Sequence, residues 1–545
     1  MLAPPPTLYR RDKGGLAYMV DAGLAGRERR SVLPAIVVAL TILFVAEGIA
    51  FATVQNVWID ESTQLLGSTL PFGRMIAWLA GHPEPLGVPA DRMPPLGYLV
   101  DWIWTRIGGT EPFGFRIVHL AFAAAAVAGL IALAGRRYGA VAALVTGALL
   151  IANPGVITVA VEARAYPLFL AATVLQLWLF DGMFRDGVGT GRLIAFTGAG
   201  LAAVFVHFFG LVSSSALFVG LFAARARSRS DLLRIGASWL ALLLLSAGIA
   251  PFVGGARAIS SDAAPQAEGM AAMAAYLPRI YGHAAMLLHP FLAVIVFLAL
   301  GALLLVTAWH ALAALPPLRK PASMEAALIV ALVAGLMVTI GAGLVVRGFD
   351  PMKPSYSIWM VPIVTLLAGA ACAPGGRISR AATGIAIVAV AALLPITIAF
   401  ARHAPWFVHG PERAIAAEIR SRAQGTAIVY VGHDWGYGYF PLIQRYGRAL
   451  PQYLLDAGGN LHPLANANPD NAPVPLGQLA GVRQVLLVSI EPRTGGDLRA
   501  LAEGTADPAL FTPLAASLDG WHRTNSIVRP GLYWLRLVRL ERNEA

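Results

Sequence analysis

The sequence is poor in charged residues and contains very little cysteine or lysine. Only 13% of its 545 residues are charged, against roughly a quarter in an ordinary soluble protein. The single cysteine, Cys372, excludes an internal disulfide. Lysine occurs only at Lys13, Lys320 and Lys353. Because 57% of the residues are hydrophobic and the mean hydropathy is +0.66, we expect an α-helical polytopic membrane protein.

The remaining positive charge is not gathered on one domain. A net charge of +11 could suggest nucleic acid, but the arginines stand in short runs between apolar segments. This distribution favours a topological role over binding to a polyanion. We therefore expect no nucleic-acid partner.

Apolar stretches near the ~20 residues needed to cross a bilayer recur along the chain. We expect about eleven membrane helices, at 32–54, 115–135, 139–157, 166–184, 192–206, 208–224, 232–252, 284–309, 325–346, 355–372 and 381–400. The fifth and sixth form one stretch interrupted around His207. Residues 1–31 are basic and polar, which argues against a cleavable signal and suggests a cytoplasmic tail.

Arginine-rich connections alternate with arginine-poor ones. Basic runs precede the first helix and then fill every second connection, including Arg136-Arg137 and Arg225 to Arg234. Such loops face the cytoplasm under the positive-inside rule. The membrane domain, 32–400, would then begin inside, and residues 401–545 would lie outside.

The first outer connection, residues 55–114, contains two amphipathic segments. Thr63–Leu79 and Leu96–Ile107 carry tryptophans among apolar neighbours, which suits helices lying in the membrane interface. Two further outer connections cover about 253–283 and 347–354.

After residue 401 the pattern becomes that of a soluble α/β domain. We expect a helix at Glu412–Arg422, a loop at 456–478, and strands at Thr426–Val431, Gln484–Ile490 and Gly531–Leu540.

An acidic pair, Asp60-Glu61, lies just beyond the first apolar segment. A carboxylate keeps its charge at a bilayer surface only beside water or a cation, so the pair is a candidate catalytic base. The alternative is helix capping, in which Asp60 accepts from the amides that open an interfacial helix. The two roles are compatible.

Further motifs follow on the same predicted side. Residues 92–99 read Arg-Met-Pro-Pro-Leu-Gly-Tyr-Leu, and residues 109–116 read Gly-Thr-Glu-Pro-Phe-Gly-Phe-Arg. Residues 162–166 read Glu-Ala-Arg-Ala-Tyr, and His207 begins His-Phe-Phe-Gly. In this order, over about residues 32–225, the motifs resemble the GT-C superfamily of membrane glycosyltransferases. The likeness is greatest to its protein-mannosyltransferase and aminoarabinose-transferase branch, similar to glycosyltransferase family 39. Arg92-Met93 stands where that group often has a histidine.

The resemblance implies an inverting transfer of a sugar from a polyprenyl-phosphate carrier to a periplasmic glycolipid, polysaccharide or protein. Asp60 would be the general base, and Glu61 an adjacent or acceptor-binding group, although nothing in the sequence excludes Glu61 as the base. The substrate contacts would be Glu162, Tyr166, His207, Arg116 and Tyr356. His207 could instead be a core histidine. The site would face the periplasm of a bacterial inner membrane, and the C-terminal domain would help to hold the acceptor.

The departing carrier phosphate requires cationic stabilisation. Lys353 and Arg347 flank a short outer loop before Tyr356, and Arg164 and Arg92 complete the candidates. Each could instead pair with a carboxylate or extend to the interface, as Arg164 could with Glu162.

We expect no cofactor. The histidines lack the spacing of a zinc site. A divalent cation on Asp60-Glu61 is an alternative, but a carrier monophosphate lacks the pyrophosphate that usually recruits one.

Two other functions fit a charged helical bundle: a transporter or flippase of lipid-linked sugars, and a non-catalytic binder of them. A transporter more often has two related halves and charges near the bilayer midplane. This sequence instead concentrates its polar motifs on one side.

Overall fold

The computed structural model describes most of the membrane domain and the strands of the C-terminal domain. The described residues are 15–54, 59–82, 91, 93–225, 228–254, 290–313, 323–345, 356–374, 377–403, 418–419, 425–432, 450–455, 460–463, 474–475, 479, 481–491, 520–529 and 534–543.

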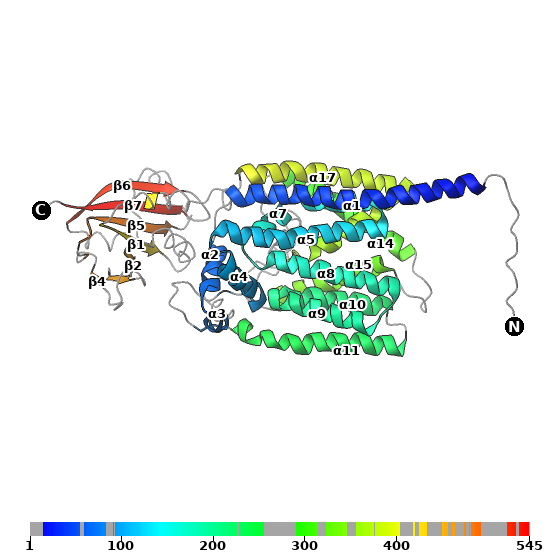
Figure 1. Cartoon of the computed structure of the whole chain (residues 1–545), viewed down its shortest axis with the longest axis horizontal. Coiled ribbons are helices and arrows are strands. Elements are labelled where there is room, and N and C mark those ends of the chain that lie inside the picture. Colours follow the sequence, from blue (N-terminus) through cyan, green and yellow to red (C-terminus); the bar gives the residue numbers. More distant parts are fainter. Residues whose placement is uncertain are drawn as a thin grey trace.

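A bundle of long helices forms the larger part of the molecule (Figure 1). Its members are α1 (Gly15–Val54), α5 (Pro112–Tyr138), α6 (Ala140–Ile151), α7 (Pro154–Val161), α8 (Tyr166–Asp186), α9 (Thr190–Val206), α10 (Phe209–Arg225), α11 (Arg229–Ser246), α14 (Pro290–Ala313), α15 (Met324–Val345), α16 (Met360–Ala371) and α17 (Arg377–His403).

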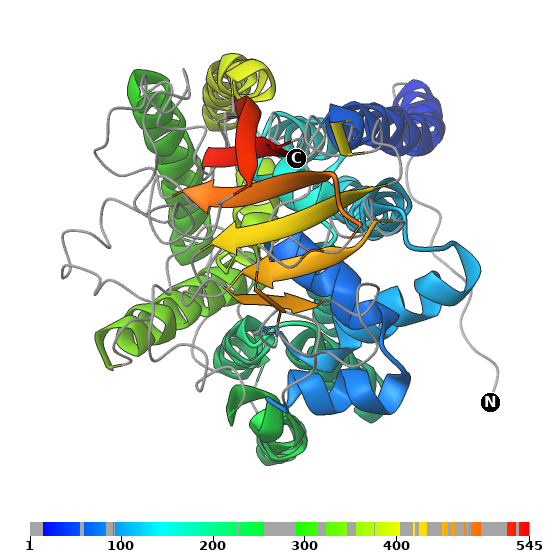
Figure 2. The ribbon, with the colours of Figure 1, turned by 90° about the vertical axis from the view of Figure 1, so that its left-hand side faces the viewer.

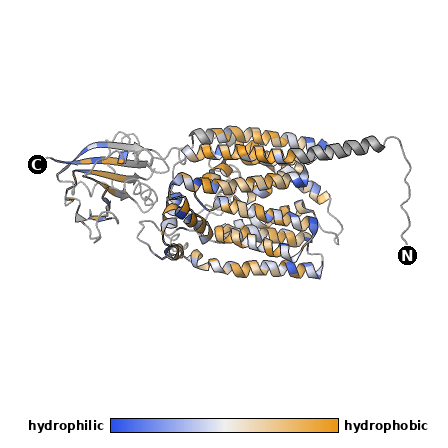
Figure 3. Cartoon of the chain, in the orientation of Figure 1, coloured by the Kyte–Doolittle hydropathy of each residue, from blue (hydrophilic) through white to orange (hydrophobic). Residues whose placement is uncertain are grey.

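Within the described ranges, seven helices are long and apolar enough to cross a membrane, or up to eight if α6 and α7 are one bent span. Helices α9, α10 and α16 are apolar but shorter. Each of the eleven predicted segments is therefore helical, which confirms a polytopic helical protein. Apolar residues run along the helices that are coloured in Figure 3.

The third predicted span, 139–157, is wrong as a single helix. It breaks at Asn153-Pro154, and α6 and α7 meet at a bend of 67°. Asn153 Oδ1 accepts from the amides of Gly155 at 2.8 Å and Val156 at 3.3 Å, so it caps α7. Pro154 occupies the first helical position, where its missing N–H costs nothing.

Three short helices lie at one end of the bundle, the end nearer to the sheet (Figure 1). They are α2 (Ile59–Thr69), α3 (Phe72–Leu79) and α4 (Pro95–Ile107). The predicted segment 63–79 is thus two helices, separated at Leu70-Pro71. Helix α3 is amphipathic as expected, because Met75 and Trp78 are buried while Arg74 is exposed.

The C-terminal domain contains a seven-stranded sheet, which lies in front of the bundle in Figure 2. In spatial order it comprises β4 (Val474–Pro475), β3 (Asn460–Pro463), β2 (Gln452–Leu455), β1 (Thr426–Gly432), β5 (Gln484–Glu491), β7 (Trp534–Arg542) and β6 (Trp521–Arg529). Strand β1 is parallel to β2 and β5, and the other pairings are antiparallel.

The three predicted strands correspond to β1, β5 and β7, and are confirmed. The predicted loop at 456–478 is wrong in part, because it includes β3 and β4. Of the predicted helix at 412–422, residues 418–419 are helical and the rest lies outside the described residues. Most of the predicted outer connection 253–283 and all of 347–354 also lie outside the described residues.

Candidate active site

The two residues of the acidic pair lie in different environments. Both are in the first turn of α2, and consecutive residues on a helix point about 100° apart. The Asp60 side chain is 34% exposed, whereas that of Glu61 is fully buried. Because α2 begins at Ile59, Asp60 lies inside the helix and does not precede it.

Glu61 joins three parts of the bundle. Arg116 of α5 bonds it twice, from Nε to Oε1 at 3.1 Å and from Nη2 to Oε2 at 2.8 Å. The amide of Ala163 donates to Oε1 at 2.8 Å. Arg116 Nη1 also donates to the carbonyl of Ala52 on α1 at 3.2 Å. Helices α1, α2 and α5 and the loop after α7 are therefore fixed around one carboxylate, and Arg116 faces protein on all these sides.

Asp60 is held through Arg164, which lies in the loop between α7 and α8. Arg164 Nη1 donates to the Asp60 carbonyl at 3.0 Å, and Nη2 lies 3.8 Å from Asp60 Oδ2. The same guanidinium forms a bidentate ion pair with Asp91, in which Nη1 bonds Oδ2 and Nη2 bonds Oδ1 at 3.3 Å. Tyr98 of α4 donates to Asp91 Oδ2 at 2.5 Å. The result is a chain from Asp60 through Arg164 and Asp91 to Tyr98.

Burial and charge determine the protonation of Arg164 and Tyr98 in this hydrogen-bonded series. Burial opposes the charged form of Arg164, but Asp91 and then Asp60 outweigh it and hold the pKa of Arg164 above its usual value. Burial, followed by the charge of Asp91, raises the pKa of Tyr98 well above its usual value. Arg164 thus stays a cation, and Tyr98 stays a hydrogen-bond donor.

Three of the predicted substrate residues meet in one aromatic group. The His207 ring lies 5.4 Å from that of Tyr166 and 5.6 Å from that of Tyr356. Phe169 stacks on His207 at 5.1 Å, and Phe209 stacks on Tyr356 at 5.4 Å. The His207 Nδ1 accepts from the Phe209 amide at 3.2 Å, which orients the ring. Residues from α8, the α9–α10 junction and the turn before α16 are thereby joined.

Another buried carboxylate, Asp101, was not predicted as a site residue. It lies on α4, and its Oδ1 is 2.8 Å from His119 Nε2 of α5. Its Oδ2 accepts from Gln64, one turn after Asp60 on α2. Asp91 was also missed. Their partners are distant in sequence, so no local spacing indicates them.

The remaining predicted residues divide into two groups. Glu162 is 2% exposed and is the C-cap residue that follows α7. Arg92, Arg347 and Lys353 lie outside the described residues. Across the residues that are described, no three His, Cys, Asp or Glu side chains are grouped as a metal site requires.

No protein-family model and no curated protein matches the sequence. Among solved structures, the chain is similar to ArnT from Cupriavidus metallidurans in the apo state, with a TM-score of 0.53 and 14% identity over 94% of this chain and 98% of that chain. It is also similar to the same ArnT bound to undecaprenyl phosphate, with a TM-score of 0.51 and 13% identity over 93% and 98%. The likeness to the oligosaccharyltransferase AglB from Archaeoglobus fulgidus has a TM-score of 0.45, with 12% identity over 84% and 69%. At these identities the likeness to ArnT establishes the architecture alone: the chain has the fold of ArnT.

Proposed function

We propose that the protein is an inverting glycosyltransferase that moves a sugar from a polyprenyl-phosphate carrier onto a periplasmic glycolipid, polysaccharide or protein. The observation that carries the proposal is the position of Asp60. It is a partly exposed carboxylate, bound to Arg164, at one end of a membrane bundle with the fold of ArnT. One of the ArnT structures has undecaprenyl phosphate bound.

In the proposed reaction, Asp60 is the general base. The acceptor oxygen or nitrogen attacks the anomeric carbon on the face opposite the carrier phosphate, and its proton passes to Asp60. The bond between the anomeric carbon and the phosphate oxygen breaks, and the polyprenyl phosphate leaves with the electron pair. Inversion follows because a single displacement takes place.

The leaving phosphate acquires negative charge, which nearby cations stabilise. The Arg164 guanidinium lies within 4 Å of the Asp60 carboxylate, and its contacts with Asp91 keep it in place. We assign Arg92, Arg347 and Lys353 to the same phosphate. Lys353 precedes Tyr356, a member of the aromatic group, by three positions in the sequence.

Glu61 is better suited to positioning than to proton transfer. It is fully buried, and both of its oxygens already accept from Arg116. We therefore assign Glu61 and Arg116 to holding α2, and with it Asp60, against α5. Glu162, Tyr166, His207 and Tyr356 remain the proposed substrate contacts.

We place the reaction on the periplasmic side of a bacterial inner membrane. Basic residues lie in the last turns of α5 and α8, at the other end of α5 from Arg116, which supports this orientation under the positive-inside rule. The C-terminal sheet lies beyond the same end as α2 to α4 (Figure 1), which supports a role in holding the acceptor.

Asp60→Asn tests the proposal, with Asp186→Asn as the matched control. Asp186 undergoes the same change but is 49% exposed and far along the chain, at the end of α8. Loss of a general base costs about 10²–10⁴-fold in rate. In a deletion strain, we expect Asp186→Asn to restore the glycan and glycolipid profile and Asp60→Asn to leave the product missing. Both variants should still bind undecaprenyl phosphate in a titration of the purified protein.

Full restoration by Asp60→Asn would contradict the catalytic assignment. A transporter or flippase would instead leave transferase activity of deletion-strain extracts intact, while unflipped carrier accumulated in the cells.

A further inference from the structure

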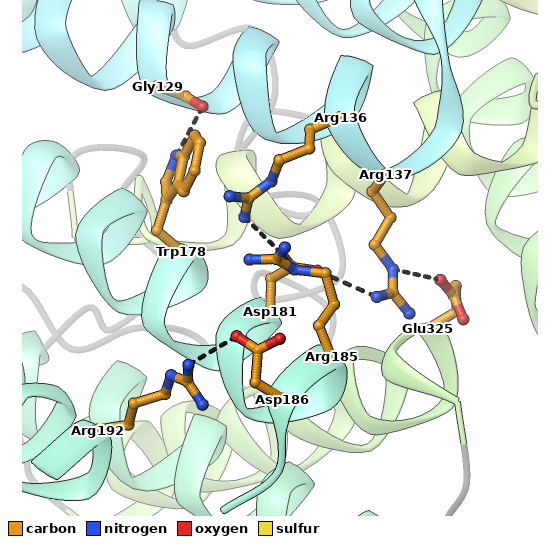
Figure 4. A network of polar contacts seen from close by, with 9 residues as sticks. All are labelled: Gly129, Arg136, Arg137, Trp178, Asp181, Arg185, Asp186, Arg192 and Glu325. Atoms are coloured by element: carbon orange, nitrogen blue, oxygen red, sulfur yellow. Dashed lines mark hydrogen bonds and ion pairs between the residues drawn. The ribbon is translucent and has the colours of Figure 1, made fainter. Parts of the chain in front are cut away.

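A cluster of charged side chains, drawn in Figure 4, lies at the C-terminal ends of α5 and α8. At its centre is Asp181 of α8, whose side chain is fully buried. Its Oδ2 accepts from Arg136 Nη2 at 2.6 Å and from Arg185 Nε at 2.9 Å. Its Oδ1 accepts from Arg137 Nη1 at 3.1 Å. We call Asp181 and these three arginines the Asp181 cluster.

The cluster has more positive than negative charge. Arg137 has a second acidic neighbour, Glu325 of α15, at 3.7 Å, and Glu325 also accepts from Tyr138 at 2.6 Å. Within the described residues, Arg136 and Arg185 have Asp181 alone as their acidic partner, and they share one of its oxygens. Three guanidiniums therefore meet two carboxylates, and the uncompensated charge belongs to Arg136 and Arg185.

These two arginines also form the outer part of the cluster. The side chain of Arg136 is 33% exposed and that of Arg185 is 42% exposed, although the carboxylate they share is buried. Both are within 3 Å of the same Asp181 oxygen, so the two guanidiniums lie side by side. Each has five N–H donors and uses one of them on Asp181. The pair presents a fork of donors whose geometry suits a phosphate group.

The position of the pair identifies the source of the phosphate. Arg116, near the start of α5, bonds Glu61 at the other end of the bundle, and Arg136 lies twenty residues later on the same helix. Twenty helical residues rise about 30 Å, which matches the apolar thickness of a bilayer. Helices α5 and α8 are both apolar and long enough to span. The pair is therefore at the membrane surface opposite the candidate active site.

The surroundings are those of a lipid headgroup. Arg136 lies over the ring of Trp178 at 4.0 Å, and Trp178 donates to the carbonyl of Gly129 at 2.8 Å. Tryptophan is enriched at this depth of the membrane. Further into the span, Leu175 of α8 is 53% exposed and Ala125 of α5 is exposed, which gives an apolar strip beside the pair. Acyl chains can cover such a strip, whereas a free anion cannot.

We propose that Arg136 and Arg185 bind the phosphate of an anionic phospholipid in the leaflet opposite the candidate active site. Asp181 holds the two guanidiniums close enough together to bind one phosphate. Trp178 contacts the lipid next to its headgroup. The proposal does not depend on the function assigned above.

The test measures retention of phosphatidylglycerol by the purified protein, using native mass spectrometry and titration with mixed phosphatidylglycerol–phosphatidylcholine vesicles. The variants are Arg136→Gln and Arg185→Gln, made singly so that Asp181 keeps two arginine partners. The matched control is Arg192→Gln, because Arg192 is 38% exposed at the same end but is paired one to one with Asp186 at 2.6 Å. We expect each cluster variant to bind phosphatidylglycerol about tenfold more weakly or worse, and the control to bind like wild type.

Thermal-unfolding midpoints verify that the variants are folded. Equal retention by all four proteins, or an equal loss in Arg192→Gln, would overturn the proposal. Glycerol phosphate and inorganic phosphate serve as competitors. If either displaced the lipid at an equal concentration, the site would bind free anions and the assignment to a lipid would be wrong. Equal affinity for phosphatidylcholine would also overturn it.

Discussion

At the residue scale, Asp60 and Glu61 show how one helical step can separate two roles. The step turns the side chain by about 100°, enough to move a carboxylate from a solvent-facing position to a buried one. Asp60 meets Arg164 at the edge of the bundle, while Glu61 is enclosed by Arg116 and the Ala163 amide. An aspartate-glutamate pair can therefore contain one group for chemistry and one for support.

We predict that Glu61→Gln destabilises the protein far more than an exposed acid-to-amide change does. The substitution removes the carboxylate that Arg116 Nε and Nη2 both bond, and breaking such a buried ion pair costs about 3–5 kcal/mol. The control is Asp186→Asn, whose exposed pair with Arg192 is worth about 1 kcal/mol or less. Thermal unfolding in detergent measures both. Equal midpoints for the two variants would show that the Glu61–Arg116 pair contributes little to stability.

Sequence patterns indicated some site residues and not others. Asp60, Glu61, Arg164, Tyr166 and His207 stand in short motifs and could be proposed from order alone. Asp91 and Asp101 could not, because their bonds to Arg164 and His119 span 73 and 18 positions. One signal was available. Asp101 follows Tyr98 by three residues, which places an acid on the buried face of an amphipathic helix.

At the element scale, hydropathy was sufficient to locate the membrane helices. Ten of the eleven predicted spans correspond to one helix each, because a lipid environment forces backbone groups to pair within the segment, and the third, 139–157, corresponds to two. Hydropathy does not detect the break between α6 and α7, since the residues on both sides are apolar. The Asn153-Pro154 sequence is the local signal, because it combines a preferred capping residue with a preferred first residue.

The junction of α9 and α10 depends on a close backbone approach. A Cβ at Gly210 would lie 2.2 Å from the carbonyl carbon and oxygen of Ala203, and backbone atoms cannot rotate away. We predict that Gly210→Ala costs about 1–3 kcal/mol or more by forcing the two helices apart. The matched control, Gly198→Ala on α9, meets nothing within 4 Å and should be neutral or stabilising by up to about 1 kcal/mol.

Thermal unfolding of the two alanine variants provides the comparison. The displacement should also disturb the His207 ring, whose Nδ1 accepts from Phe209. Comparable midpoints for the Gly210 and Gly198 variants would mean that the junction accommodates a methyl group.

The strands divide by composition. Strand β1 was predictable because residues 427–430 are all apolar and buried, as in a central strand covered on both faces. Strands β2, β3 and β4 were not, because they are two to four residues long and two of them contain proline. Such short strands at the side of a sheet depend on their neighbours, not on their own residues.

At the scale of the whole molecule, the shared fold is detectable although sequence identity is 14%. Lipid-facing positions require only apolar character, so their identities can change while the pattern of spans remains. Specific polar pairs such as Glu61 with Arg116 bring distant segments together. Architecture can therefore outlast recognisable sequence similarity.

The proposed topology predicts the outcome of reporter fusions. An alkaline phosphatase fused after residue 403 should be active, because α17 would deliver it to the periplasm. An alkaline phosphatase fused at Gly187, between α8 and α9, should be inactive, because this connection would lie in the cytoplasm. A green fluorescent protein fused at the same position should fluoresce. The reverse pattern would place Asp60 on the cytoplasmic side and contradict the proposed site.

Helix α7 has a consequence for how the chain can vary in length. Its eight residues are all buried, Asn153 fixes one end, and the other end leads into the loop that carries Ala163 and Arg164. The helix therefore acts as a fixed-length spacer of about 12 Å, with each residue contributing about 100° of rotation. One residue more or fewer would turn Arg164 away from both Asp60 and Asp91. Surface loops usually tolerate insertions. In α7, by contrast, the number of residues sets the direction in which the Arg164 side chain points.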